Sequence, residues 1–389
     1  MENFIYDRCS KVIFGKDTEN QVGEEVKKFG NTVLLLYGGG SIKKWGLYDR
    51  VIKSLKKSGL KVVELGGVRP NPTYDLIYEG IKICRDNSVD IVLAVGSGST
   101  IDSAKGIAVG VPCKDDLLDI ALKKVVPKEA LPIGVILTLP AAGSETSQYA
   151  VATYNDNGYP MKRDIVWENN QIIRPQFAIM NPELTFSLPP EQTAYGISDI
   201  IAHVMERYFT SVENVELTDR LSEAVMKTVI NNGPIVMKEP KNYNARAEIM
   251  WAGSIAHNDL LGTGRQGDFV SHMIEHELSA LYDIAHGAGL SIIFPAWMRY
   301  VYKHNIDRFL QFATRVRNVD HNFYDPEQTI LEAIKKQEDF YKELGLPTRL
   351  SNLNIPHDRF EEMAEKAVKT GSIKKINTKD IVEILKLAK

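Results

Sequence analysis

Apolar and polar positions alternate in two distinct patterns along the first half of the chain. Continuous runs of Val, Ile and Leu end in small or polar residues, as buried strands do, and helical periodicity fills the intervals between them. The strand-like segments are 31–41, 60–67, 90–100 and 132–146. The helix-like segments are 42–59, 71–89 and 101–110. This alternation predicts right-handed βαβ units and a parallel sheet.

The pattern changes twice in the second half. Residues 148–183 hold two β-rich runs with polar turn residues between them, which predicts a hairpin. After Pro189 and Pro190, which suit a helix start, strand-like runs become rare. We therefore expect an α/β domain over 1–183 and an all-helical domain over 184–389, with the lysine-rich tail as a solvated helix. The expected helices are 190–211, 214–231, 243–262, 268–282, 286–304 and 326–344.

Composition excludes several classes of function. A net charge of −3 with 25% charged residues does not favour nucleic acid or an acidic membrane surface as a partner. No apolar run is long enough to cross a bilayer, and we expect no signal peptide in the first residues. The scattered Cys9, Cys84 and Cys113 form no C-x-x-C pair, so we expect a reducing cytoplasm.

Two of the expected strands end in glycine-serine turns that open helices, Gly38-Gly39-Gly40-Ser41 and Gly96-Ser97-Gly98-Ser99-Thr100. Such turns present backbone N–H groups and a positive helix end to a phosphate. Neither is a full G-x-G-x-x-G or Walker loop, and each alone is compatible with an ordinary tight turn. Together with the small residues at 138–147, they predict a dinucleotide site at the carboxyl edge of the sheet. The first turn holds no acid to bind a ribose but is followed by Lys43 and Lys44, which favours NADP over NAD.

A candidate metal centre lies in the helical half. Asp199 and His203 are spaced i,i+4 in an apolar helix, so their side chains share one face. Aspartate with histidine suits Zn²⁺ or Fe²⁺. The plain alternative is a buried Asp–His hydrogen bond without a metal.

The remaining ligands are sought in the segment 271–287, which holds His272, His276 and His286. One choice takes His272 and His276 from one helix, matching the H-x-x-E-H pattern of a zinc peptidase with Glu275 as base. The other takes His272 and His286, and leaves His276 one turn away to handle protons. The spacing leaves both choices open.

The residues resemble the iron-containing (group III) alcohol dehydrogenases, particularly their butanol dehydrogenase branch. The resemblance covers nearly the whole chain, through "YGGGSIKK", "AVGSGSTIDSAKGIA", "TLPAAGSETS", "NPELTFSLPPEQTAYGISDIIAHVMERY" and "SHMIEHELSALYDIAHGAGLSIIFPAWMRY". It implies metal ligation by Asp199, His203, His272 and His286, with His276 as the proton-handling residue. It also implies cofactor contacts from Gly38, Gly39, Ser41, Asn71, Gly96, Ser97, Gly98, Ser99, Asp102, Thr138, Ser144, Ser147 and Lys162.

The resemblance further implies hydride transfer between NADP or NAD and a small primary alcohol or aldehyde, at Fe²⁺ or Zn²⁺, in a homodimer. It places the nicotinamide between the two domains. A glycine stands where NAD-using relatives carry an aspartate after the first strand, in line with NADP. Three alternative functions remain: a polyol dehydrogenase of the same fold, the zinc peptidase, and a nucleotide sensor with a structural metal.

Overall fold

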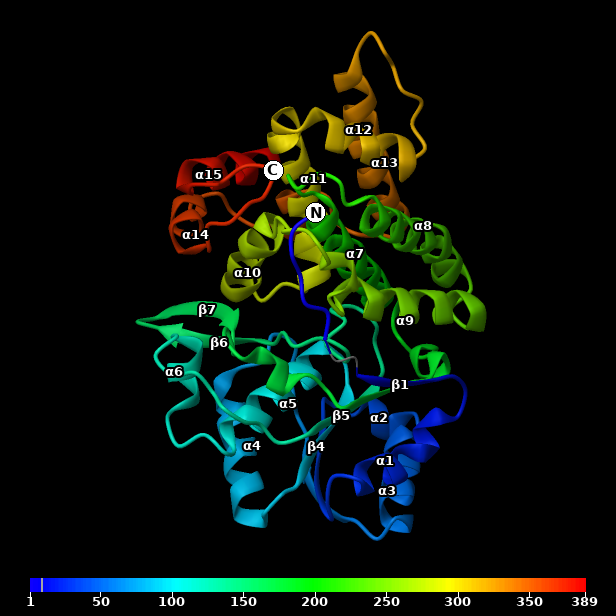
Figure 1. The fold of residues 1–389 in the computed structure, drawn as a ribbon, viewed down its shortest axis with the longest axis vertical. Helices are drawn as coiled ribbons and strands as arrows, with labels where there is room; N and C mark the ends of the chain where they lie inside the picture. Colours follow the sequence, from blue (N-terminus) through cyan, green and yellow to red (C-terminus); the bar gives the residue numbers. More distant parts are fainter. Residues whose placement is uncertain (8–9) are drawn as a thin grey trace. The chain divides into compact units, whose positions relative to one another are not determined.

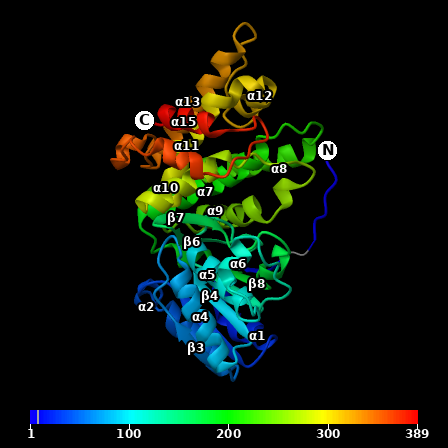
Figure 2. The same ribbon diagram turned by 90° about the vertical axis from the view of Figure 1, so that its left-hand side faces the viewer.

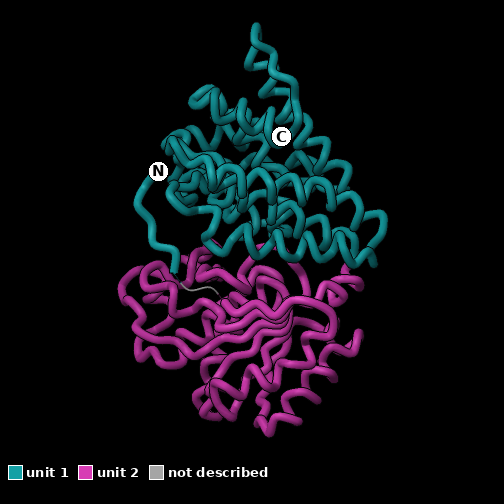
Figure 3. Tube along the Cα trace, turned by 45° about the vertical axis from the view of Figure 1, so that its right-hand side comes forward, with its two compact units in different colours: residues 1–7, 189–389 teal, residues 8–188 magenta. Residues whose placement is uncertain are grey.

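The computed structural model describes residues 1–7 and 10–389 and divides into two compact units, shown in Figure 3. One unit comprises residues 8–188 and is α/β; the other comprises 1–7 and 189–389 and is helical. The α/β architecture followed by a helical C-terminal region was predicted and is confirmed. A division by contacts does not show that either unit folds alone, so the predicted domains, 1–183 and 184–389, stay a prediction.

The α/β unit is built on a parallel sheet. Within the described residues the sheet has six strands in the order β1-β8-β5-β4-β2-β3, and every pairing is parallel. The strands are β1 (Lys11–Phe14), β2 (Thr32–Tyr37), β3 (Lys61–Leu65), β4 (Ile91–Gly96), β5 (Ile133–Leu137) and β8 (Phe177–Met180). β4 and β5 are buried at every position because helices cover both faces of the sheet.

The two faces are covered by different helices (Figures 1 and 2). Val22, Val51 and Leu55 pack with Leu35 and Leu93 of the central strands, which places α1 and α3 on one face. α4 and α5 pack against each other through Gly80 and Gly106, where a Cβ would meet an isoleucine of the other helix. The helices of this unit are α1 (Val22–Lys27), α2 (Ser41–Lys44), α3 (Leu47–Lys57), α4 (Tyr74–Asn87), α5 (Gly98–Gly110) and α6 (Leu117–Ala121). The predicted hairpin forms from antiparallel β6 (Val151–Asp156) and β7 (Tyr159–Asp164).

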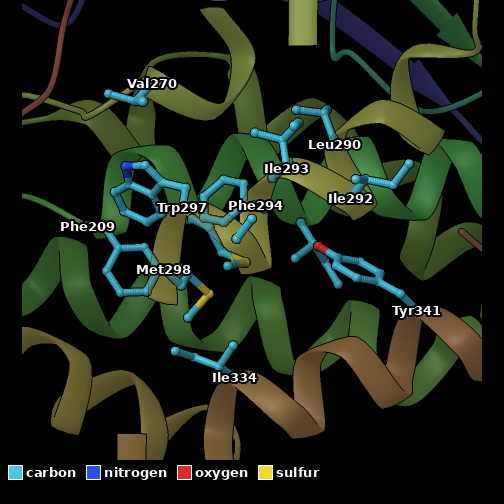
Figure 4. Close-up of a cluster of buried hydrophobic side chains, with 14 of the residues drawn as sticks. Phe209, Val270, Leu290, Ile292, Ile293, Phe294, Trp297, Met298, Ile334 and Tyr341 are labelled. Atoms are coloured by element: carbon cyan, nitrogen blue, oxygen red, sulfur yellow. The ribbon is translucent and has the colours of Figure 1, made fainter. Parts of the chain in front are cut away.

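The helical unit surrounds an apolar central helix, α11. Nearly every side chain of this helix is buried, and a helix that is apolar all round belongs in a core. Its helices are α7 (Pro190–Tyr208), α8 (Glu216–Lys238), α9 (Tyr243–His257), α10 (Val270–Tyr282), α11 (His286–Val301), α12 (Ile306–Arg315), α13 (Pro326–Glu343), α14 (Phe360–Lys366) and α15 (Thr378–Leu387). Figure 4 shows Trp297 and Phe294 beside Phe209, with ring centroids of Phe209 and Trp297 5.4 Å apart. Rings packed in this way fix α11 against the end of α7.

Two expectations about the elements need correction. The single helix expected over 42–59 is interrupted at Gly46, whose left-handed φ of 71° separates α2 from α3. The tail is not a solvated helix: α15 begins only at Thr378 and buries Ile381, Ile384 and Leu385. The lysines of this segment suggested a fully exposed helix. The apolar residues between them are spaced i, i+3 and i+4, so they form a stripe that faces the core. No described helix is long and apolar enough to span a membrane.

Candidate metal centre and nucleotide-binding pocket

α7 presents three polar side chains on one face. Asp199, His203 and Glu206 are spaced i, i+4 and i+7, so they follow one another along the helix. All three are buried, and Asp199 and His203 are each 4% exposed. A buried carboxylate and imidazole need partners, since burial without them is costly.

The turn between α10 and α11 brings His286 back to this face. α10 ends at Tyr282, Asp283 takes a left-handed φ of 48°, and His286 is the first residue of α11. At Gly287 a Cβ would lie only 2.1 Å from the carbonyl oxygen of Tyr195, so glycine permits α11 to approach the backbone of α7 one turn before Asp199. His286 is thereby placed beside Asp199.

Among the described residues, Asp199, His272 and His286 each place one ligand atom within 4.8 Å of the others. Nε2 of His272 lies 3.8 Å and Nε2 of His286 3.6 Å from Oδ1 of Asp199. Two imidazole nitrogens and one carboxylate oxygen directed at a common point are a donor set for Zn²⁺ or Fe²⁺.

The hydrogen bonding of these atoms tests whether a cation fits. Asp199 Oδ1 and His272 Nε2 are buried and have no hydrogen-bond partner among the described residues. Burial opposes ionisation of Asp199, but the neighbouring histidines outweigh it and hold its pKa well below the usual range. Burial likewise opposes the charged form of His272, yet Asp199 and Glu206 raise its pKa to about 9. Unpartnered donor atoms in a site of negative potential fit a divalent cation.

His203 and His276 flank this group without belonging to the Asp199, His272 and His286 cluster. Nδ1 of His203 lies 3.0 Å from Oδ1 of Asp199 and contacts its backbone oxygen, while the ring centroid is 4.5 Å from that of His272. His276 is buried with its ring 5.7 Å from His286. A second candidate group joins His276 with Glu275 and His286.

The spacing of residues along the chain did not indicate that His257 lies beside the proposed metal centre. Its ring centroid lies 4.2 Å from that of His203. It ends α9, and nothing in the local sequence pairs it with α7. The packing of the two helices alone brings it there.

The α/β unit contains a pocket at the carboxyl ends of β2, β4 and β5. The chain leaves β2 for β3 on one side and reaches β4 on the other, which makes the β2–β4 boundary a switch point of the sheet. Seven of the expected cofactor residues line this pocket: Gly38, Gly39, Ser41, Gly96, Ser97, Ser99 and Thr138. Six further residues line it as well: Ile42, Val68, Arg69, Pro70, Val95 and Thr100. Lys43 and Lys44 are not among the lining residues; their ammonium groups lie over the rings of Tyr37, Tyr48 and Trp45.

The other expected cofactor residues, apart from Gly98 at the start of α5, lie in two hydrogen-bonded groups. Lys162 donates to Asn71, whose φ is 52°. Asp102 accepts from Ser144 Oγ at 2.7 Å, and the buried Lys105 donates to Ser144 and to the carbonyl of Ser147. Lys105 was missed because a lysine inside an apolar helix gives no signal of its internal acceptors. The second group holds the loop after β5 against α5. None of these residues is part of the pocket lining described above.

Comparisons with known proteins agree with this geometry. Residues 9–182 match the model of iron-containing alcohol dehydrogenase, and residues 193–389 match that of the C-terminal part of the Fe-containing alcohol dehydrogenase family. The chain is 43% identical over 392 residues to the probable NADH-dependent butanol dehydrogenase 2 of Bacillus subtilis, covering 99% of each chain. It is 35% identical to the NADPH-dependent aldehyde reductase of Escherichia coli, covering 95% of this chain and 94% of the relative.

A solved structure shows the same fold. The crystal structure of NADH-dependent butanol dehydrogenase A from Thermotoga maritima superposes with a TM-score of 0.94 at 38% identity, covering 100% of this chain and 99% of the other. The chain therefore belongs to the iron-containing alcohol dehydrogenase family.

Proposed function

We propose that this protein is an NAD(P)-dependent alcohol dehydrogenase that reduces small aldehydes, of which butanal is an example, and oxidises the matching primary alcohols. The observation that carries the proposal is the gathering of Asp199, His272 and His286 around a common point in a chain of this family. Its relatives are named as butanol dehydrogenases and an aldehyde reductase. A non-catalytic sensor does not account for these similarities over the full chain.

The proposed metal ligands are Asp199, His203, His272 and His286. A divalent cation there supplies Lewis-acid polarisation of a carbonyl group. His203 completes the set because its ring lies against that of His272 and its nitrogen lies close to Asp199. Asp with three histidines suits Fe²⁺ and Zn²⁺ alike, and the family's description favours iron.

We propose His276 as the group that moves the proton. It is held one helical turn after His272 and lies near His286 without joining the Asp199 group. Imidazole is the side chain most often used to donate or accept a proton at neutral pH. The peptidase reading is not supported, because Glu275 contacts His286 and Ser279 instead of being available as a base.

In the α/β unit, the expected cofactor residues bind and orient the nucleotide, which supplies or accepts the hydride. The backbone of the Gly38 and Gly96 turns and the start of α5 face the pocket and suit phosphate groups. We propose a preference for NADPH, because the pocket lining holds Arg69 and no acidic side chain. The Bacillus subtilis relative is named as NADH-dependent, which is an argument for NADH. The preference for NADPH or NADH is therefore to be measured directly.

The test is a panel of aldehydes with the metal-replete enzyme, followed at the nicotinamide absorbance with NADPH and with NADH. Turnover of short unbranched aldehydes is expected, with faster reaction from NADPH. Equal rates with both nucleotides would remove the NADP preference. Reaction with polyols alone would favour a polyol dehydrogenase, and no turnover of any member would remove the proposed function.

We also propose a homodimer in a reducing cytoplasm. The two cysteines that the structure describes, Cys84 and Cys113, are free, while Cys9 lies outside the described residues. Light scattering on the purified protein tests the dimer, and fractionation of the source cells tests the location.

A further inference from the structure

Two buried glutamates contact the histidines of the metal centre from behind. Glu206 on α7 and Glu275 on α10 are both 0% exposed. Neither is among the proposed ligands, and a buried carboxylate without a role is unfavourable. Their contacts reveal the same arrangement twice.

Glu206 holds His272. Its Oε1 accepts from the backbone N–H of His272 at 3.0 Å and lies 2.9 Å from ring Nδ1. The opposite nitrogen, Nε2, is then the one directed toward Asp199, 3.8 Å from Oδ1. An Nδ1–H bound by a carboxylate leaves Nε2 with the lone pair that a metal needs.

Glu275 holds His286 in the same way. Its Oε2 contacts Nδ1 of His286, and Nε2 of that ring lies 3.6 Å from Oδ1 of Asp199. The other oxygen, Oε1, accepts from Ser279 Oγ one turn along α10. The side chain of His286 is 23% exposed, against 5% for His272, so this ring has more freedom for a carboxylate to restrict.

A glycine makes room for Glu275. At Gly289 of α11 a Cβ would lie 2.6 Å from Cγ and 2.7 Å from Oε1 of Glu275. Gly289 therefore lets α11 close over the carboxylate, while Nδ1–H of His286 on the same helix donates a hydrogen bond to it. The packing at Gly289 and the hydrogen bond to His286 both hold the Glu275 carboxylate beside the His286 ring.

We propose that Glu206 and Glu275 are positioning residues of the metal centre, each fixing the tautomer and ring orientation of one ligand histidine. The proposal rests on the proposed ligand set. Partners of this kind contribute about 10- to 100-fold to metal affinity in other sites. Glu275, which the sequence pattern offered as a peptidase base, thus acts through His286.

The experiment measures the dissociation constant of Co²⁺ by chelator competition, together with the visible spectrum of the Co²⁺ protein. Glu275→Leu, which cannot accept a hydrogen bond, is expected to weaken binding by about 10- to 100-fold and to change the spectrum. Glu275→Gln keeps an acceptor oxygen, so it is expected to restore most of the affinity. Glu277→Gln is the matched control, because Glu277 is equally buried on α10 but belongs to neither candidate metal group.

Two further variants separate the possible failures. Gly289→Ala moves the carboxylate without changing any charge, so it is expected to weaken Co²⁺ binding even if Glu275→Leu does not fold. Wild-type affinity and spectrum in Glu275→Leu or Gly289→Ala would overturn the positioning role. His286→Ala tests the ligand set itself: unchanged Co²⁺ affinity in that variant would defeat the proposed metal centre and not only the role of Glu275.

Discussion

Gly287→Ala is the substitution with the most direct structural consequence for the metal centre. The new Cβ would lie 2.1 Å from the Tyr195 carbonyl oxygen and 2.7 Å from its carbonyl carbon. Carbon and oxygen atoms normally approach no closer than about 3.3 Å, so the start of α11 must move away from α7 by about 1 Å. Metal–ligand distances are conserved to about 0.2 Å, so we expect that His286, a proposed ligand, would no longer reach the ion.

We expect Gly287→Ala to lower Co²⁺ affinity by at least about tenfold, equivalent to about 1.4 kcal/mol. Overpacking should also cost about 1–3 kcal/mol of folding stability, visible as a lower denaturation midpoint. Chelator competition and urea titration measure the two effects separately. Gly262→Ala is the control, since the nearest atom to its added Cβ is 3.8 Å away. Wild-type metal affinity in folded Gly287→Ala would refute the reasoning.

Three further outcomes follow from the described geometry. His286→Ala should lose its metal. His276→Ala should keep its metal and turn over about 10²- to 10⁴-fold more slowly. Loss of metal from His276→Ala alone, measured by elemental analysis, would favour the H-x-x-E-H pairing. A Cβ added at Gly38 would lie 3.4 Å from the carbonyl oxygen of Val68, so the site has room for Gly38→Asp. The new carboxylate should repel the 2′-phosphate and raise the KM for NADPH by about tenfold or more, while leaving the KM for NADH unchanged. Equal effects on the two KM values would count against this. Burial raises the pKa of Cys84 to about 12, so alkylation of the native protein at pH 8 should label Cys113 much faster, as peptide mass spectrometry would show.

Periodicity predicted the elements that carry strong patterns. The runs that became β2, β3, β4 and β5 are rich in Val, Ile and Leu, and the start of α7 is marked by two prolines. β1 and β8 were missed because each is only four residues long and gives little periodic signal. They pair with each other across more than 160 residues, which no local pattern encodes.

The candidate site shows the same limit. The i,i+4 spacing of Asp199 and His203 correctly placed both on one helix face. The choice between His276 and His286 as a ligand depends instead on tertiary structure. The turn after α10 and the contact of Gly287 with α7 decide where His286 lies, so only the resemblance to the family could favour His286. The partnership of Glu275 with His286 is likewise tertiary, and the motif alone suggested a different role for this carboxylate.

The most direct test of the account is an anomalous difference map from a crystal of the metal-loaded enzyme, collected at the absorption edge of the bound metal. We predict one strong peak within bonding distance, about 2.0–2.2 Å, of Asp199 Oδ1, of Nε2 of His272 and His286, and of a ring nitrogen of His203. A peak bound by His272 and His276 with Glu275 nearby, or no peak at Asp199, would contradict it.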